Sequence, residues 1–118
     1  YGCDDCQLVC PWNSFAQVSD APDFRVRNGL DDRELISLFA WTEQEFDTRL
    51  AGSAIRRIGH ERWLRNLAVG LGNARRAAVG HTTAGEGASA EDIAQALQDA
   101  YDSADALVQE HIGWALQA

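Results

Sequence analysis

The chain has 118 residues, of which 46% are hydrophobic, and it carries a formal net charge of −8. This length and apolar content predict one soluble globular domain, and no apolar run approaches the roughly 18 residues that a membrane span requires. The acidic, cysteine-rich start lacks the basic and apolar regions of a secretion signal, so we expect a cytoplasmic protein with no membrane partner.

Three cysteines lie within the first ten residues, and the chain contains no others. Cys3, Cys6 and Cys10 are followed by Pro11 in the arrangement C-x2-C-x3-C-P. This is the last part of the bacterial ferredoxin pattern C-x2-C-x2-C-x3-C-P, in which thiolates bind 4Fe-4S clusters. The first cysteine of that pattern would precede Tyr1. Because the chain also contains no methionine, we expect it to be a piece of a longer protein.

Other uses of the three cysteines remain open. A disulfide framework would require an even number of cysteines and an oxidising compartment. A structural zinc site would require a fourth ligand, which a distant His60, His81 or His111 would have to supply. The thiols could also be inert or redox-reactive without binding a metal. The spacing favours iron–sulfur ligation among these alternatives.

Residues 14–30 predict an irregular connecting segment, because they hold Pro22 and Asn28-Gly29 and no sustained apolar periodicity. Helical signals follow at two capping boxes, Asp31–Glu34 and Thr42–Glu45. In each box an acceptor side chain precedes a glutamate by three residues and an apolar stripe comes after. We therefore expect two short helices after residue 30.

A longer helix is predicted over residues 59–73. Its apolar face follows the spacing i, i+3, i+4 and i+7 of a buried helix face. The residues on that face are Leu64, Leu67, Ala68 and Leu71. Gly72-Asn73 predicts the C-terminal end of this helix, because glycine and asparagine are common just after helices.

The last third of the chain predicts two helices that form an antiparallel hairpin. Ser89 and Asp105 are the expected N-caps, and a turn near residues 101–103 joins the two helices. Residues 105–116 look like the second helix of a HEAT repeat, a unit that stacks into helical solenoids. No alternating β-branched run competes with these helices. The predicted fold class is all-α, with a ferredoxin-like iron–sulfur loop over residues 1–13 and a HEAT-like domain over residues 31–118.

All ten basic residues are arginines, and their distribution is uneven. Residues 49–76 carry seven arginines against Glu61 alone, a net charge of +6, while the segments on either side carry −7 each. The arginine fork suits bidentate phosphate contacts and stacking on bases, although ion pairs with Glu61 or with an acid of a neighbouring helix are an alternative. The candidate RNA contacts are Arg56, Arg57, Arg62 and Arg65, which Arg75 and Arg76 could extend.

Aromatic residues could add stacking surfaces for bases, but the sequence favours a packing role for them. We expect the four tryptophans to lie in the core or between helices. They are Trp12, Trp41, Trp63 and Trp114. His60 lies next to the arginines, and we expect it to be a surface or capping histidine rather than an RNA contact.

Three parts of the chain together carry a resemblance to a known family. They are the head YGCDDCQLVCPWN (1–13), the runs GSAIRRIG (52–59) and ERWLRNLA (61–68), and the HEAT-like tail. They closely resemble the C-terminal third of the epoxyqueuosine reductases. The resemblance runs along nearly the whole chain, and the two internal runs are more specific than the cysteine spacing.

The resemblance implies an oxidoreductase that removes the epoxide oxygen of epoxyqueuosine at the wobble position of tRNA to give queuosine. It implies cobalamin, bound mainly by a region upstream of Tyr1, and two 4Fe-4S clusters. Cys3 and Cys6 would bind one cluster and Cys10 the other. The protein would be a monomer, and its partner would be the anticodon stem-loop of tRNA.

The resemblance does not account for all that the reaction needs. It places no catalytic residue in this chain, and three thiolates fall short of two clusters, so we expect the chain alone to be inactive. The alternative hypothesis is a HEAT-like protein-binding module with a structural metal site.

Overall fold

A computed structural model describes residues 4–31, 33–79 and 87–117. Within these ranges the regular secondary structure is entirely helical, which confirms the all-α prediction. The α-helices are α1 (Asp5–Leu8), α2 (Leu35–Phe39), α3 (Glu43–Arg49), α4 (Gly59–Val79), α5 (Ala90–Tyr101) and α6 (Ala106–Leu116). Three short 3-10 helices lie between them, namely η1 (Pro11–Phe15), η2 (Pro22–Phe24) and η3 (Ala54–Ile58).

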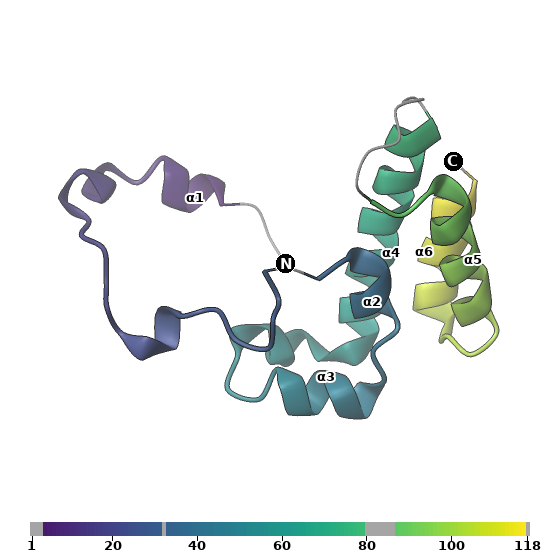
Figure 1. Ribbon diagram of the computed structural model, residues 1–118, viewed down its shortest axis with the longest axis horizontal. Helices are drawn as coiled ribbons and strands as arrows, with labels where there is room; N and C mark the ends of the chain where they lie inside the picture. The colour runs from purple at the N-terminus through teal and green to yellow at the C-terminus, as the bar shows by residue number, and fades with distance from the viewer. Residues whose placement is uncertain (1–3, 32, 80–86, 118) are drawn as a thin grey trace.

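The segment before α2 contains only short turns of helix and extends away from the other helices (Figure 1). Both η1 and η2 begin at a proline, whose fixed φ suits the first residue of a helical turn. No side chain described between residues 4 and 29 is buried. Residues 14–30 hold no α-helix, in keeping with the irregular connection expected there.

The core of the protein lies around α4, which packs most extensively against α6 and also contacts α5, α2 and η3. Helices α5 and α6 run antiparallel beside α4, joined by the turn after Tyr101 (Figure 1). The buried side chains come from α2 through α6 and form one cluster. Phe46, Leu50, Leu71, Leu97 and Ile112 are at most 1% exposed. The assignment of these hairpins to the HEAT class stays a prediction.

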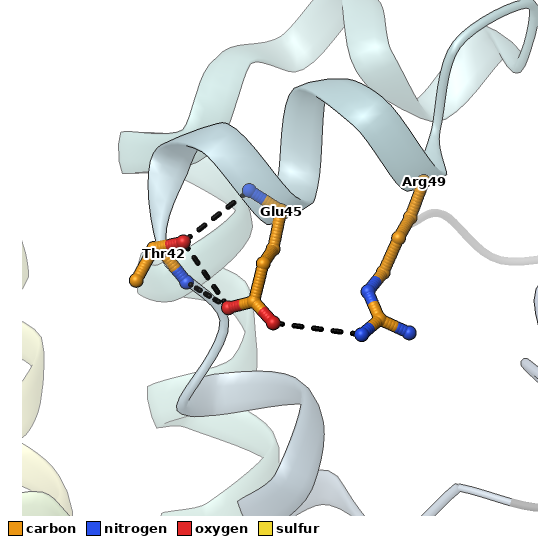
Figure 2. A network of polar contacts seen from close by, with 3 residues as sticks. All are labelled: Thr42, Glu45 and Arg49. Atoms are coloured by element: carbon orange, nitrogen blue, oxygen red, sulfur yellow. Dashed lines mark hydrogen bonds and ion pairs between the residues drawn. The ribbon is translucent and has the colours of Figure 1, made fainter.

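Three N-caps expected from sequence are confirmed. Thr42 and Glu45 form a full capping box at the start of α3, as Figure 2 shows. The Thr42 backbone N–H and then its hydroxyl donate to the Glu45 carboxylate, and these bonds lower the pKa of Glu45 below 4.5, with a smaller contribution from Arg49. Ser89 forms a second box with Asp92 at α5, and Asp105 caps α6.

Two helix boundaries differ from the prediction. The prediction of a capping box at Asp31–Glu34 is wrong, because Glu34 is itself the N-cap of α2. Its backbone angles are extended, and its side chain forms no capping hydrogen bond. The helix expected to end at Gly72-Asn73 continues to Val79. Gly72 is a packing position instead: a Cβ added there would lie 2.9 Å from the Cβ of Ala115 on α6. Glycine is needed at this point for the close approach of two helices.

The tryptophans divide into two pairs. Trp41 and Trp63 lie in the core as expected, with their rings stacked at a centroid distance of 5.8 Å. Trp12 is 73% exposed, so the expectation of a packing role is wrong for it, whereas Trp114 is 41% exposed but packs between two helices as expected. Trp12 belongs to the segment that lies outside the helical core. Trp114 of α6 lies against α4, with its Cζ3 atom 2.9 Å from the position of a Cβ on Gly72 and its ring beneath the Arg76 guanidinium.

Candidate nucleic-acid interface and cysteine segment

The cysteine segment forms a compact turn outside the helical core. Cys6 lies in α1 and is exposed, while Cys10 is the N-cap of η1 and is half-buried; both are free thiols. The Asn13 side-chain amide donates to the Gln7 carbonyl and ties the loop after Cys10 back to α1. Cys3 lies outside the described residues. The two described thiols are therefore held within one turn and are accessible to a metal.

The histidines considered as zinc ligands are part of the helical packing. His60 Nε2 lies 2.7 Å from the Trp41 carbonyl oxygen, and His111 Nδ1 lies 2.8 Å from the Leu107 carbonyl oxygen. His81 lies outside the described residues. Among the residues that the structure describes, no group of three His, Cys, Asp or Glu side chains is placed to hold a metal ion. The described cysteines thus have no histidine beside them to complete a zinc site.

Arg56 and Arg57 follow each other in η3, whose start is fixed by the Ser53 hydroxyl accepting from the Ile55 N–H. Arg56 forms an ion pair with Asp47 of α3, with Nε and Oδ1 2.9 Å apart and both side chains about half exposed. Arg57 is exposed, and its guanidinium contacts no polar partner within the described part of the chain. Arg57 therefore offers an uncompensated charge, whereas Arg56 shares its charge with a carboxylate.

Arg62 and Arg65 lie on the first turns of α4, directly after η3. Arg62 Nη1 donates to the Ile58 carbonyl at 3.3 Å, and Arg65 donates twice to the Asn66 side-chain oxygen. Neither pairs with Glu61. The alternative that Glu61 neutralises Arg57 or Arg62 is wrong, and the ion pair to a neighbouring helix is made by Arg56. These four arginines keep most of their donors available.

Arg75 and Arg76 lie at the other end of α4, about 15 Å along the helix from Arg65 at 1.5 Å per residue. Arg75 Nη1 donates to the Leu116 carbonyl at 3.1 Å, at the C-terminal end of α6. The Arg76 guanidinium lies 3.9 Å from the centroid of the Trp114 ring. Both side chains are used in packing α4 against α6, where cations are favourable beside helix carbonyls. They do not continue the surface of Arg56 and Arg57.

Two further arginines, Arg25 and Arg27, lie outside the arginine-rich stretch of residues 49–76 and were not predicted as site residues. These residues lie in the connecting segment and line a small cavity together with Arg49. Residues 25–30 approach residues 49–53 through a tertiary contact, a hydrogen bond from the Asn28 side-chain amide to the Arg49 carbonyl. Helix periodicity carries no signal for such a contact. An arginine count restricted to residues 49–76 therefore could not find this cluster.

The fold and these sites define a class of protein: a small all-α domain with an arginine-bearing helical surface and an accessible cysteine turn. In the described part of the chain, no helix is long and apolar enough to cross a membrane. No family model and no solved structure matches the chain.

Similar proteins are found among curated sequences. The chain is 61% identical over its whole length to an epoxyqueuosine reductase of Burkholderia pseudomallei, of which it covers 29%. It is 56% identical over 98% of its length to one of Xanthomonas campestris (29% covered), and 48% identical over 98% to one of Escherichia coli (27% covered). The chain spans about 29% of the length of the first of these relatives. The resemblance read from the sequence is confirmed: the chain corresponds along its whole length to a part of the epoxyqueuosine reductases.

Proposed function

We propose that this chain is the RNA-docking and cluster-ligating part of an epoxyqueuosine reductase, which removes the epoxide oxygen of epoxyqueuosine at the wobble position of tRNA to give queuosine. The observation that carries the proposal is the identity of 46–61% to proteins of that name along the whole chain. The chain covers less than a third of those relatives. The reductive reaction would therefore involve other parts of such a protein.

The RNA-docking surface that we propose consists of Arg56, Arg57, Arg62 and Arg65. Support comes from their placement on η3 and the adjoining first turns of α4. The guanidinium of Arg57 is also exposed and forms no ion pair with a described side chain. Structured RNA is bound largely through phosphates and shape, which guanidinium groups suit. The anticodon stem-loop is the proposed partner because the reaction takes place at the wobble base. The acidic charge of the rest of the chain would confine RNA to this surface.

The proposed role of the cysteine turn is to supply thiolate ligands to 4Fe-4S clusters. Cys6 and Cys10 are free and accessible, and thiolates are the ligands that such clusters require. The donor type fits, but the number does not suffice: the chain has three cysteines, and one such cluster takes four. Cys3, Cys6 and Cys10 would therefore need thiolates from elsewhere in a longer protein. When bound, the clusters would supply electrons to the cobalamin that the family uses, and cobalamin would be held mainly by another region.

Binding of an anticodon stem-loop RNA tests the docking surface. The double variant Arg57→Gln/Arg62→Gln removes two charges that form no ion pair among the described side chains, and the fold should survive because both residues are exposed. We expect the slope of log K against log salt to become shallower by about one for each phosphate that the protein no longer neutralises. The matched control Arg33→Gln removes one exposed arginine outside the surface and should keep the slope. An unchanged slope in the double variant would exclude the surface from RNA binding.

Anaerobic reconstitution with iron and sulfide tests the cysteine turn, in the longer protein that supplies the remaining ligands. The unsubstituted protein should turn brown, and Cys6→Ala or Cys10→Ala should lower the bound iron. The control Asp5→Ala, in α1 between Cys3 and Cys6, should leave the iron content unchanged. A colourless protein containing zinc would instead support the alternative of a structural metal site.

A further inference from the structure

A small cavity of about 170 Å³ lies between the end of the connecting segment and the turn that follows α3. One wall comes from residues 23–30 and the other from residues 49–53. Three arginines line it, namely Arg25, Arg27 and Arg49, against the single carboxylate of Asp23 among the described residues. None of the four arginines of the RNA-docking surface lines the cavity, although Ser53 in its wall is the N-cap of η3. Because the side chains that line it carry a net positive charge, the cavity favours a negatively charged ligand.

No polar side-chain partner is found for Arg25 or Arg27 in the described ranges, which is true also of Arg33 and Arg57. Most of the others are engaged: Arg49 with Glu45, Arg56 with Asp47, and Arg75 with the last turn of α6. Asp23 shares the cavity wall yet forms no ion pair with either of the two. Two uncompensated guanidinium groups therefore face a common space, where they repel each other unless an anion lies between them.

The backbone around the cavity is held in place by specific contacts. Asn28 and Gly29 adopt φ values of 62° and 61°, and the Asn28 side-chain amide donates to the Arg49 carbonyl across the two walls. Arg27 Nη1 lies only 4.0 Å from the position that a Cβ would take on Gly52, which has φ 77°. The Arg27 guanidinium thus spans from its own wall to the opposite turn. The backbone that carries the two arginines is thus held in place before a ligand binds, which lowers the entropic cost of binding.

The size and the donors of the cavity together select the ligand. At about 170 Å³ it is smaller than the roughly 300–1,000 Å³ of cavities that take whole small molecules, so it suits a single compact group. Guanidinium groups bind phosphate oxygens through paired N–H donors. The Ser53 hydroxyl, whose oxygen accepts from the Ile55 N–H, keeps its own hydrogen for a further acceptor in the cavity. We infer that this cavity is a binding site for one phosphate group, held by Arg25 and Arg27.

The site takes either a free phosphate ion or a phosphate of a nucleic-acid backbone. The second source rests on the proposed RNA-docking function, whereas the first does not. The experiment therefore measures the two separately, first with inorganic phosphate and then with the anticodon stem-loop RNA.

The first measurement is a titration of the 118-residue chain with inorganic phosphate, followed by amide chemical shifts in NMR spectra. We expect saturable shifts confined to residues 23–30 and 49–53. Arg27→Gln should weaken binding by about tenfold, since one charge-assisted hydrogen-bonding group is removed, and Arg27→Lys should weaken it less. Arg33→Gln is the matched control, because Arg33 is exposed, lies outside the cavity lining and should leave the affinity unchanged. Shifts that do not saturate, or that Arg33→Gln reduces as much as Arg27→Gln, would overturn the inference.

The second measurement uses the RNA with the variant Arg25→Gln/Arg27→Gln. If the site takes a backbone phosphate, the RNA affinity of this variant falls and inorganic phosphate competes with RNA for the wild-type cavity. If the variant binds RNA as tightly as the wild type does, and inorganic phosphate saturates the cavity of the wild type, the site binds a free phosphate ion. The loss of RNA binding in the variant Arg57→Gln/Arg62→Gln tests the docking surface and does not depend on the result for the cavity. The docking surface can therefore fail while the phosphate site holds, and the reverse.

Discussion

The segment before α2 and the helical domain that follows it have similar supplies of apolar residues but use them differently. Leu8, Val9, Phe15 and Val18 are each 74–97% exposed in the first region, whereas Phe46, Leu50, Leu97 and Ile112 in the second are at most 1% exposed. Apolar side chains stabilise a fold only when they leave water. The helical domain therefore supplies the stability of this chain, whereas the first region supplies the thiols of the cysteine turn and Arg25 and Arg27 of the cavity.

The largest test of this difference compares two phenylalanines. Phe46→Ala removes a ring that is 1% exposed and packs against Trp63 and His60, so we expect a loss of about 3–5 kcal/mol in the free energy of unfolding. Phe15→Ala removes a ring that is 74% exposed and should change that free energy by less than about 0.5 kcal/mol. Urea denaturation of both variants gives the two values. Equal losses would mean that the first region shares the core.

A second test asks how closely the helical domain is packed. Gly72→Ala places a Cβ 2.9 Å from the Ala115 Cβ and 3.0 Å from its Cα, a backbone atom that cannot rotate away. We expect a net loss of stability, because overpacking costs about 1–3 kcal/mol and the gain in helix propensity is only about 0.5–1 kcal/mol. The control is Gly113→Ala on α6, where nothing lies within 4 Å and only the propensity gain applies. Thermal unfolding should move in opposite directions for the two variants.

The features that sequence predicted correctly are local. A capping box depends on only four consecutive residues, so Thr42–Glu45 could be identified without knowledge of the fold, as could the N-cap Ser89. The same holds for Asp105 and for the all-α class, which follows from helical periodicity. The Asp31–Glu34 box has the same form but fails, since Glu34 is in extended conformation where a third helical residue was expected.

The features that sequence missed depend on contacts between distant segments. From sequence, Gly72 predicts the end of a helix, whereas in the fold it allows the close approach of Ala115 on α6. From sequence, Arg76 was a possible RNA contact, but in the fold its guanidinium packs on the ring of Trp114, which lies 38 residues further along the chain. Arg25 and Arg27 gain their common cavity only when the turn after α3 closes it. In the candidate site, the residue types could therefore be predicted, but the division between packing and binding arginines could not.

A third test concerns the end of the helical domain and has a smaller expected effect. Asp105→Ala removes the carboxylate that accepts from the Val108 N–H at 2.9 Å at the start of α6. We expect a loss of about 1 kcal/mol, the usual contribution of an N-cap. Asp102→Ala removes the same charge three residues earlier, at the C-terminal end of α5, where a carboxylate is unfavourable. Its stability should be unchanged or slightly higher, so equal losses would mean that charge rather than capping is responsible.

The smallest expected effect is the pH dependence of the α3 capping box. Hydrogen bonds from the Thr42 backbone and hydroxyl, with a smaller contribution from Arg49, lower the pKa of Glu45 in the folded state below its ordinary 4.5. A carboxyl whose folded pKa is lowered stabilises the fold above its unfolded pKa, and the contribution is lost as the pH falls through the folded pKa. The stability difference between the wild type and Glu45→Gln should thus be full at neutral pH and shrink as the pH drops below 4.5.

The control for this measurement is Glu43→Gln, which makes the same charge change in the same first turn of α3 without a bond to Thr42. Both variants remove one acid beside the same helix N-terminus, so subtracting one from the other removes the effect of the helix dipole. What remains is the part of the pH dependence that belongs to the hydrogen bonds of the box and, to a smaller extent, to the Arg49–Glu45 ion pair. If the two variants gave the same profile, the capping bonds would contribute nothing beyond charge, and the helical domain at this end would be stabilised by buried side chains such as Trp41, Phe46 and Leu50.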